Sequence, residues 1–217
     1  MRLPYVPTTP PTMSSSPSAT PENAPTAAAA YTQLSARRSP KPLQALDLTL
    51  LHSPPVASGW SSFLGAIRTQ TSLPPDVREL CICRVAVLNG AAYEWDHHAP
   101  ILKSEGKLSD DVLRELNERK AWQGWEDTIG GGTGAGEGEG DLGGGLTERQ
   151  RAVLAYTDAM TVGVKVSDEI FAGLRGFFPE EREVVEITAT VAAYNCVSRF
   201  LVALDVGGMS ERDGRES

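Results

Sequence analysis

The densest group of ionisable and aromatic side chains lies between residues 91 and 100, where the sequence reads AAYEWDHHAP. Two of the chain's three histidines are in this segment. On a helix, Glu94 and His98 are four residues apart and share a face, whereas His97 points about 100° away from His98. Because Glu94 is also three residues before His97, either imidazole could be its partner. A carboxylate beside an imidazole can transfer protons near neutral pH.

A second carboxylate, Glu79, lies twelve residues before this segment, in the first turn of the preceding predicted helix. Asn89-Gly90 favours a tight reversal, and an antiparallel helix pair would bring Glu79 back towards His98. We therefore predict that Glu79 and His98 form a proton-transfer pair, with Glu94 and His97 tuning or sharing that role. The alternative is that Glu94 and His98 are an ordinary ion pair on a solvated helix.

Metal, redox and acyl-transfer chemistry have weaker support. A metal site would draw on Glu94, Asp96 and a histidine, but the chain has no HExxH or CxxC spacing. We therefore expect no metal site. Cys81 and Cys83 are two residues apart on a predicted helix and point to opposite sides, which favours two core residues over a disulfide. No serine or cysteine stands in a recognisable nucleophile turn.

The apolar pattern predicts an all-α fold. Residues such as Trp60, Leu64 and Ile67 recur at spacings of three and four, and no stretch shows the sustained alternation of a strand. A capping box at residues 147–150 predicts a helix start. The predicted helices cover residues 58–69, 77–88, 91–104, a short stretch after Ser109, segments beginning at residues 147 and 167, and a long final helix at 181–206 that Pro179 introduces.

Composition divides the chain. Residues 1–42 are rich in Pro, Ser, Thr and Ala, which predicts a disordered leader. A mitochondrial transit peptide is the alternative, although the many prolines would break its amphipathic helix. Residues 130–145 read GGGTGAGEGEGDLGGG, a flexible Gly-rich surface insert. We predict one helical domain over residues 43–207, followed by a disordered tail at 208–217.

Charge and cysteine content exclude some partners. The formal net charge is −8, and because the leader carries four basic residues and one acid, everything after it sums to −11. An acidic body of this kind disfavours nucleic acid and anionic membranes. No run of about 18 uninterrupted apolar residues suits a membrane span. Three cysteines are too few for a disulfide framework and favour a reducing compartment, so we expect a cytoplasmic protein.

Several segments resemble the carboxymuconolactone decarboxylase and alkylhydroperoxidase D superfamily. The resemblance is carried by Arg78-Glu79-Leu80, Arg84-Val85-Ala86 and the run from Asn89 to His98, between Leu73-Pro74 and Gly106. In the C-terminal half it is carried by residues 146–150, 166–171 and 194–200. The resemblance implies an alkylhydroperoxidase D-like helical bundle that assembles as a homotrimer or homohexamer.

The peroxidase branch of this superfamily is similar to the pattern Glu-x11-Cys-x2-Cys-x3-His. Here the glutamate matches Glu79 and the histidine matches His98, but Ala91 and Glu94 stand at the two cysteine positions. This departure disfavours dithiol peroxidase chemistry. The resemblance is therefore closer to the decarboxylase branch, which implies a cofactor-free reaction on a small carboxylated lactone or related carbonyl compound.

Four further residues are predicted to contact the substrate. Arg84 could hold a substrate carboxylate, although it lies about 140° around its helix from Glu79 and a subunit contact is the alternative. Tyr93 and Trp60 could line a pocket, a core or an interface, and Asn195 lies on the last helix. Two other functions stay open on the same fold: an isomerase or dehydratase, and an inactive oligomeric binding protein.

Overall fold

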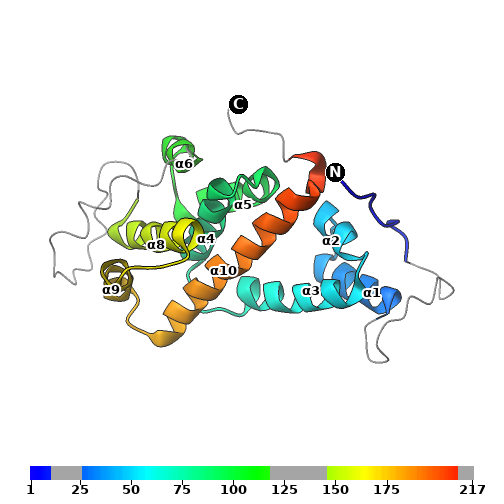
Figure 1. Cartoon of the computed structure of the whole chain (residues 1–217), viewed down its shortest axis with the longest axis horizontal. Coiled ribbons are helices and arrows are strands. Elements are labelled where there is room, and N and C mark those ends of the chain that lie inside the picture. The colour runs from blue at the N-terminus through cyan, green and yellow to red at the C-terminus, as the bar shows by residue number, and fades with distance from the viewer. Residues whose placement is uncertain (11–25, 118–145, 210–217) are drawn as a thin grey trace. The chain divides into compact units, whose positions relative to one another are not determined.

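The computed structural model describes residues 1–10, 26–117 and 146–209. Every regular element in these ranges is a helix, which confirms the all-α prediction. The Gly-rich insert at 130–145 and residues 210–217 of the predicted tail lie outside the described residues. The α-helices in Figure 1 are α1 (Ala27–Arg38), α2 (Ala45–Leu50), α3 (Pro54–Thr69), α4 (Pro75–Leu88), α5 (Ala92–Gly106), α6 (Asp110–Asn117), α8 (Glu148–Asp158), α9 (Asp168–Phe177) and α10 (Glu181–Leu204).

The chain divides into two compact units, where we predicted one domain over residues 43–207. Unit 1 comprises Met1–Gln70 and Leu204–Gly208, and unit 2 comprises Thr71–Ala203 and Met209–Ser217. The boundary at residue 70 falls between α3 and α4, well before the Gly-rich insert. Unit 1 includes helix α1 of the N-terminal segment.

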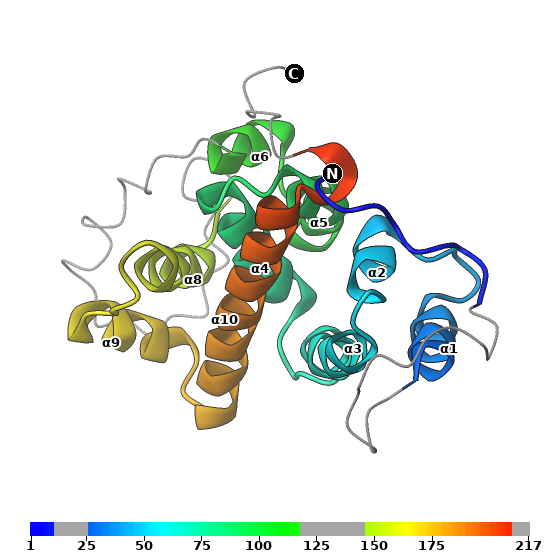
Figure 2. The same cartoon turned by 45° about the vertical axis from the view of Figure 1, so that its right-hand side comes forward.

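That helix, α1, corrects the prediction of a leader disordered throughout residues 1–42. Thr26 caps the helix by accepting a hydrogen bond from the backbone of Ala29, and Ala30 and Leu34 are buried. In Figure 2, α1 packs against α3. The alanine-rich run has high helix propensity, and two buried side chains are sufficient to attach it. Composition alone did not reveal this, because few large apolar residues are involved.

A buried aspartate holds the end of α1 to α2. Asp47 is fully buried and accepts hydrogen bonds from Arg37 at 2.6 Å, from Arg38 at 2.7 Å and from the backbone of Gln44 at 2.9 Å. A buried carboxylate is tolerable only when it is paired in this way. The ion pairs therefore fix the C-terminal end of α1 within unit 1.

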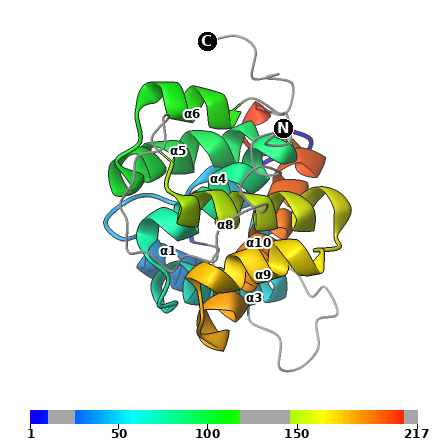
Figure 3. The same cartoon turned by 90° about the vertical axis from the view of Figure 1, so that its left-hand side faces the viewer.

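Unit 2 is built around α4. From Val77 to Val87 this helix buries every residue except Arg78. Helices α5 and α8 pack against it, and α9 lies along α8, as Figure 3 shows. Because α4 is surrounded by other helices, its charged side chains Glu79 and Arg84 must find partners inside the protein.

The turn between α4 and α5 is the predicted tight reversal. Gly90 adopts a positive φ of 66°, a conformation that glycine reaches without strain. The side chain of Asn89 donates to the Oδ1 atom of Asn195 at 3.1 Å and to the Oγ atom of Ser198 at 2.7 Å. The turn is therefore held to α10 as well as closed on itself.

The predicted helix starts in the C-terminal half are confirmed, and one element is unexpected. Thr147 and Gln150 form the capping box of α8, and Ser167 caps α9. After α8 the chain continues as a π-helix, Ala159–Gly163, which ends at Val164 with a positive φ of 64°. A β-branched residue in this conformation is strained, and the apolar pattern gives no sign of it.

Helix α10 is long and apolar enough, by length and composition, to cross a membrane, which we did not expect from the sequence. The core helix of a soluble protein meets the same criteria. Here buried residues such as Tyr194 and Val197 alternate with residues that bond to other helices of unit 2. One example is Thr188, which shares a hydrogen bond of 2.8 Å with Tyr156 of α8.

Candidate active site

Glu79 of α4 and His98 of α5 are in direct contact. The Nδ1 atom of His98 lies 2.7 Å from the Oε2 atom of Glu79. The carboxylate is almost fully buried, with 5% of its side chain exposed, whereas His98 keeps 15% exposed. The helix pair thus places an imidazole between a buried carboxylate and the protein surface, as the spacing predicted.

The second oxygen of Glu79 is bound by its neighbour. Arg78 donates from Nε to the Oε1 atom of Glu79 at 3.2 Å. One carboxylate therefore faces a guanidinium at one oxygen and an imidazole at the other. An ionised carboxylate can only accept, and against it the Nδ1–H of His98 is the donor. This arrangement leaves Nε2 as the basic nitrogen of a neutral ring.

An aromatic ring from α10 packs on the imidazole. The rings of Tyr194 and His98 meet edge to face, with their centroids 5.3 Å apart at an angle of 85°. Tyr194 is fully buried. Because the contact is edge to face, it restricts rotation of the imidazole about its χ2 angle. The orientation of His98 is therefore set from two helices, α4 and α10.

Glu94 lies in the same region. It is buried with 2% of its surface exposed, and its charge acts on Cys83 of α4. Burial is the main cause that raises the pKa of Cys83 well above its ordinary value, and the charges of Glu79 and Glu94 raise it further. Two carboxylates from different helices thus lie near one small thiol.

His97 and Tyr93 lie on another face of α5. His97 is exposed, its Nδ1 atom is 2.7 Å from the backbone carbonyl of Tyr93, and the two rings stack with centroids 4.3 Å apart. Successive helical residues diverge by about 100°, so His97 does not share the face of His98. Its predicted part in tuning or sharing the role of His98 stays a prediction. Tyr93 is half-buried, and its predicted contact with substrate stays a prediction.

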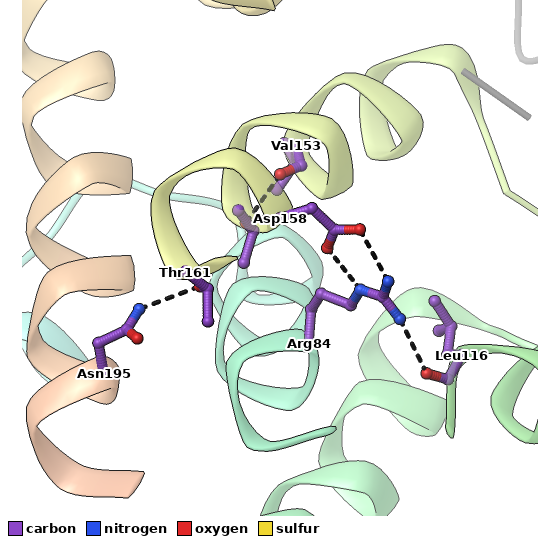
Figure 4. A network of polar contacts seen from close by, with 7 residues as sticks. Arg84, Leu116, Val153, Asp158, Thr161 and Asn195 are labelled. Atoms are coloured by element: carbon purple, nitrogen blue, oxygen red, sulfur yellow. Dashed lines mark hydrogen bonds and ion pairs between the residues drawn. The ribbon is translucent and has the colours of Figure 1, made fainter. Parts of the chain in front are cut away.

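Arg84 is buried on the side of α4 that faces away from Glu79. Figure 4 shows its guanidinium paired with Asp158, with Nε–Oδ1 and Nη2–Oδ2 distances of 2.5 and 2.7 Å. Its Nη1 atom donates to the carbonyl of Leu116 at 3.3 Å. With 2% of its surface exposed, Arg84 holds α4, α6 and α8 together. Contact with a substrate carboxylate or with another subunit would require exchange of these bonds, and the predicted role of Arg84 stays a prediction.

Asn195 is a structural bridge in this structure. Its Nδ2 atom donates to Thr161 of the π-helix at 3.0 Å, as Figure 4 shows, and its Oδ1 atom accepts from Asn89 and from Arg199. Contact with substrate would require exchange of these bonds. Trp60 lies on α3 in unit 1 and is half-buried, and its predicted role stays a prediction.

Two residues near the pair were missed by the sequence analysis. Arg78 was overlooked because adjacent helical residues do not face one another, and only a long side chain can curl back to its neighbour. Tyr194 was quoted in the family resemblance, but nothing in its own spacing connects it to His98. Within the described ranges, no three His, Cys, Asp or Glu side chains are grouped to hold a metal ion.

Comparison with known proteins finds one family that matches part of the chain. Residues 54–128 match the carboxymuconolactone decarboxylase family. The match includes the helix pair that carries Glu79 and His98, and it confirms the resemblance to the carboxymuconolactone decarboxylase and alkylhydroperoxidase D superfamily. The search of curated proteins finds no match.

A solved structure shares the fold. The chain is similar to a protein of unknown function from Agrobacterium tumefaciens that is described as a proposed antioxidant defence protein AhpD. The two are 22% identical, the TM-score is 0.54, and the alignment covers 71% of this chain and 90% of the other. At this identity the likeness establishes the alkylhydroperoxidase D-like fold and nothing about the reaction.

Proposed function

We propose that this protein is a cofactor-free enzyme of the carboxymuconolactone decarboxylase kind, acting on a small carboxylated lactone or related carbonyl compound. The observation that carries the proposal is the contact of 2.7 Å between His98 Nδ1 and the buried Glu79 carboxylate. A buried carboxylate that orients an imidazole is the arrangement used to move protons at neutral pH.

In the proposed reaction, the Glu79–His98 pair supplies the proton that decarboxylation requires. Loss of carbon dioxide leaves an electron pair on carbon, which an adjacent carbonyl takes up as an enolate. Protonated His98 then gives its Nε2 proton to that carbon, and water returns a proton to the ring. The net reaction exchanges a carboxylate and one proton for a hydrogen and carbon dioxide. Glu79 remains ionised and stabilises the imidazolium formed in each cycle.

The test is carbon dioxide release from a panel of carboxylated γ-lactones. Glu79→Gln should lower kcat by about 10²–10⁴-fold, the usual contribution of a positioned acid–base group. Glu105→Gln makes the same chemical change at an exposed position on α5 and should leave kcat unchanged. If both variants release carbon dioxide at the wild-type rate, the pair has no part in the chemistry.

Two alternatives keep the same fold. An isomerase or dehydratase would use the Glu79–His98 pair without loss of carbon dioxide, and mass spectrometry would then find a product of unchanged mass or one lighter by water. An inactive binding protein would retain the pair for packing only. In that case His98→Ala would lower the melting temperature without any kinetic consequence.

The description of the Agrobacterium protein raises the possibility of antioxidant defence. A dithiol peroxidase needs reactive thiolates, whereas Cys81 and Cys83 are buried and burial raises the pKa of both thiols. Ala91 and Glu94 occupy the family's cysteine positions. These residues speak against peroxidase activity, which consumption of cumene hydroperoxide with a dithiol reductant would reveal.

The proposed enzyme also has an assembly state and a cellular location. We propose a cytoplasmic homotrimer or homohexamer, with a small molecule as substrate and no nucleic acid or membrane partner. The acidic balance of the chain supports the last point, since it repels phosphate groups. Sedimentation equilibrium of the full chain measures the assembly directly, and a monomer at micromolar concentration would contradict it.

A further inference from the structure

An anionic substrate needs a cation at this site. Glu79 and Glu94 place two buried carboxylates in the region, and both would repel a carboxylated ligand when ionised. The arginine that we predicted for this task, Arg84, is fully engaged with Asp158 on the far side of α4. Another positive group must therefore balance the charge next to His98.

Arg78 is the guanidinium that reaches the pair. Its Nε atom holds Glu79, and in the described part of the chain no hydrogen bond or ion pair joins its two terminal nitrogens to another residue. Its side chain keeps 18% of its surface exposed, close to the 15% of His98 and well above the 5% of Glu79. The two partially accessible groups thus flank the buried carboxylate.

We propose that Arg78 is the substrate-anion-binding residue of this site. In this proposal, which rests on the proposed function, Nε stays on Glu79 while Nη1 and Nη2 form two parallel hydrogen bonds to a substrate carboxylate. A guanidinium suits both tasks at once because its five N–H groups lie in one plane. The bound substrate is thereby placed beside His98.

The carboxylate that Arg78 holds is one that the product retains. Binding the carboxylate that leaves would stabilise the ground state, because its negative charge moves to the carbonyl oxygen during the reaction. A retained carboxylate is bound equally before and after the step, so it supplies position without opposing the chemistry. Arg78 therefore binds the substrate, and His98 transfers the proton.

Calorimetric titration tests this role without turnover. The probes are γ-carboxy-γ-butyrolactone and its uncharged methyl ester, titrated into the full chain. Arg78→Gln should weaken binding of the acid at least tenfold and leave that of the ester unchanged. Arg78→Lys keeps the charge but not the planar fork, and should fall between Gln and wild type. Arg114→Gln removes an exposed arginine of α6 and should bind as wild type.

Melting curves of all three variants establish whether each is folded. If Arg78→Gln is not folded, the affinity of Arg78→Lys is compared with that of wild type instead. Equal affinity of wild type and Arg78→Gln for the acid would overturn the inference, as would a wild-type protein that binds neither probe. Arg78-dependent binding without any carbon dioxide release would overturn the proposed reaction alone. Carbon dioxide release that needs Glu79 but not Arg78 would overturn only the role of Arg78.

Discussion

The two carboxylate oxygens of Glu79 contact different residues. Arg78 donates to Oε1, and the Nδ1 atom of His98 lies 2.7 Å from Oε2. Glu79 is therefore poorly placed to donate a proton itself. The spacing of residues predicted the contact but left the acid and base roles open, because it carries no sign of the bond from Arg78.

The buried pair of Arg84 and Asp158 should matter for stability. Asp158→Ala leaves a buried guanidinium without its counter-charge, and we expect it to lower the free energy of unfolding by about 3–5 kcal/mol. Replacing both partners with apolar residues, Arg84→Met with Asp158→Leu, should recover much of the loss. Urea unfolding monitored by circular dichroism measures the effect.

Asp111→Ala is the control for that experiment, because it breaks an exposed ion pair with Arg114. Such pairs contribute at most about 1 kcal/mol. If Asp158→Ala cost no more than Asp111→Ala, the buried pair would not be what joins α4 to α8.

The cysteines should differ sharply in reactivity. Burial raises the pKa of Cys81 to about 12 and that of Cys83 well above its ordinary value of 9.0, whereas Cys196 is exposed. Iodoacetamide at pH 8 should therefore label Cys196 in the folded protein and all three thiols in denaturant. Peptide mass mapping reads the result, and rapid labelling of Cys81 or Cys83 in the folded protein would contradict it.

The same pKa shifts set a limit on stability at high pH. Because the folded-state pKa of Cys81 is raised, the neutral thiol contributes its full stability below about pH 9. That contribution is lost as the pH rises from 9 towards 12, since only the unfolded chain ionises freely. If the free energy of unfolding increased over this pH range, ionisable groups other than Cys81 would have to cause the increase.

At the scale of elements, the antiparallel pair of α4 and α5 is the feature that the sequence predicted best. Asn89-Gly90 marked the turn, and the apolar run of α4 indicated burial. What spacing could not provide was the third element. The contacts of α10 with Asn89 and His98 join segments that are about a hundred residues apart in the chain, and single-sequence periodicity carries no information about such pairings.

Asn89→Ala tests how much α10 contributes to the turn. The change removes two hydrogen bonds, to Asn195 and to Ser198, and leaves those partners with unfilled bonding capacity. We expect the free energy of unfolding to fall by about 1–3 kcal/mol. Thermal and urea unfolding measure it. A change below about 0.3 kcal/mol would show that α10 does not hold the turn in solution.

The π-helix between α8 and α9 could not be predicted from the sequence. Asp158 precedes it, Thr161 lies within it, and strained Val164 ends it. Each of the first two residues is bonded to a different helix, Asp158 to α4 and Thr161 to α10. These two tertiary contacts stabilise a local conformation that helix propensity alone disfavours, since insertion of an extra residue per turn weakens the backbone ladder.

At the scale of the whole molecule, the composition of the N-terminal segment led to a prediction of disorder where helix α1 forms. Leu34 is completely buried, so Leu34→Ala should lower the free energy of unfolding by about 2–5 kcal/mol. Leu3→Ala makes the same change at an exposed position of the same segment and should cost less than about 1 kcal/mol. If neither substitution alters unfolding, the segment is a disordered leader after all.

The central claim concerns one hydrogen bond, between His98 Nδ1 and Glu79. Nitrogen-15 NMR of the full chain labelled at histidine resolves the tautomer, because a protonated ring nitrogen and a basic one differ widely in chemical shift. We predict that His98 carries its proton on Nδ1 at pH 8 and that Glu79→Gln changes its ring-nitrogen shifts, whereas exposed His97 is unaffected. A His98 ring protonated on Nε2, or one indifferent to Glu79→Gln, would contradict the account.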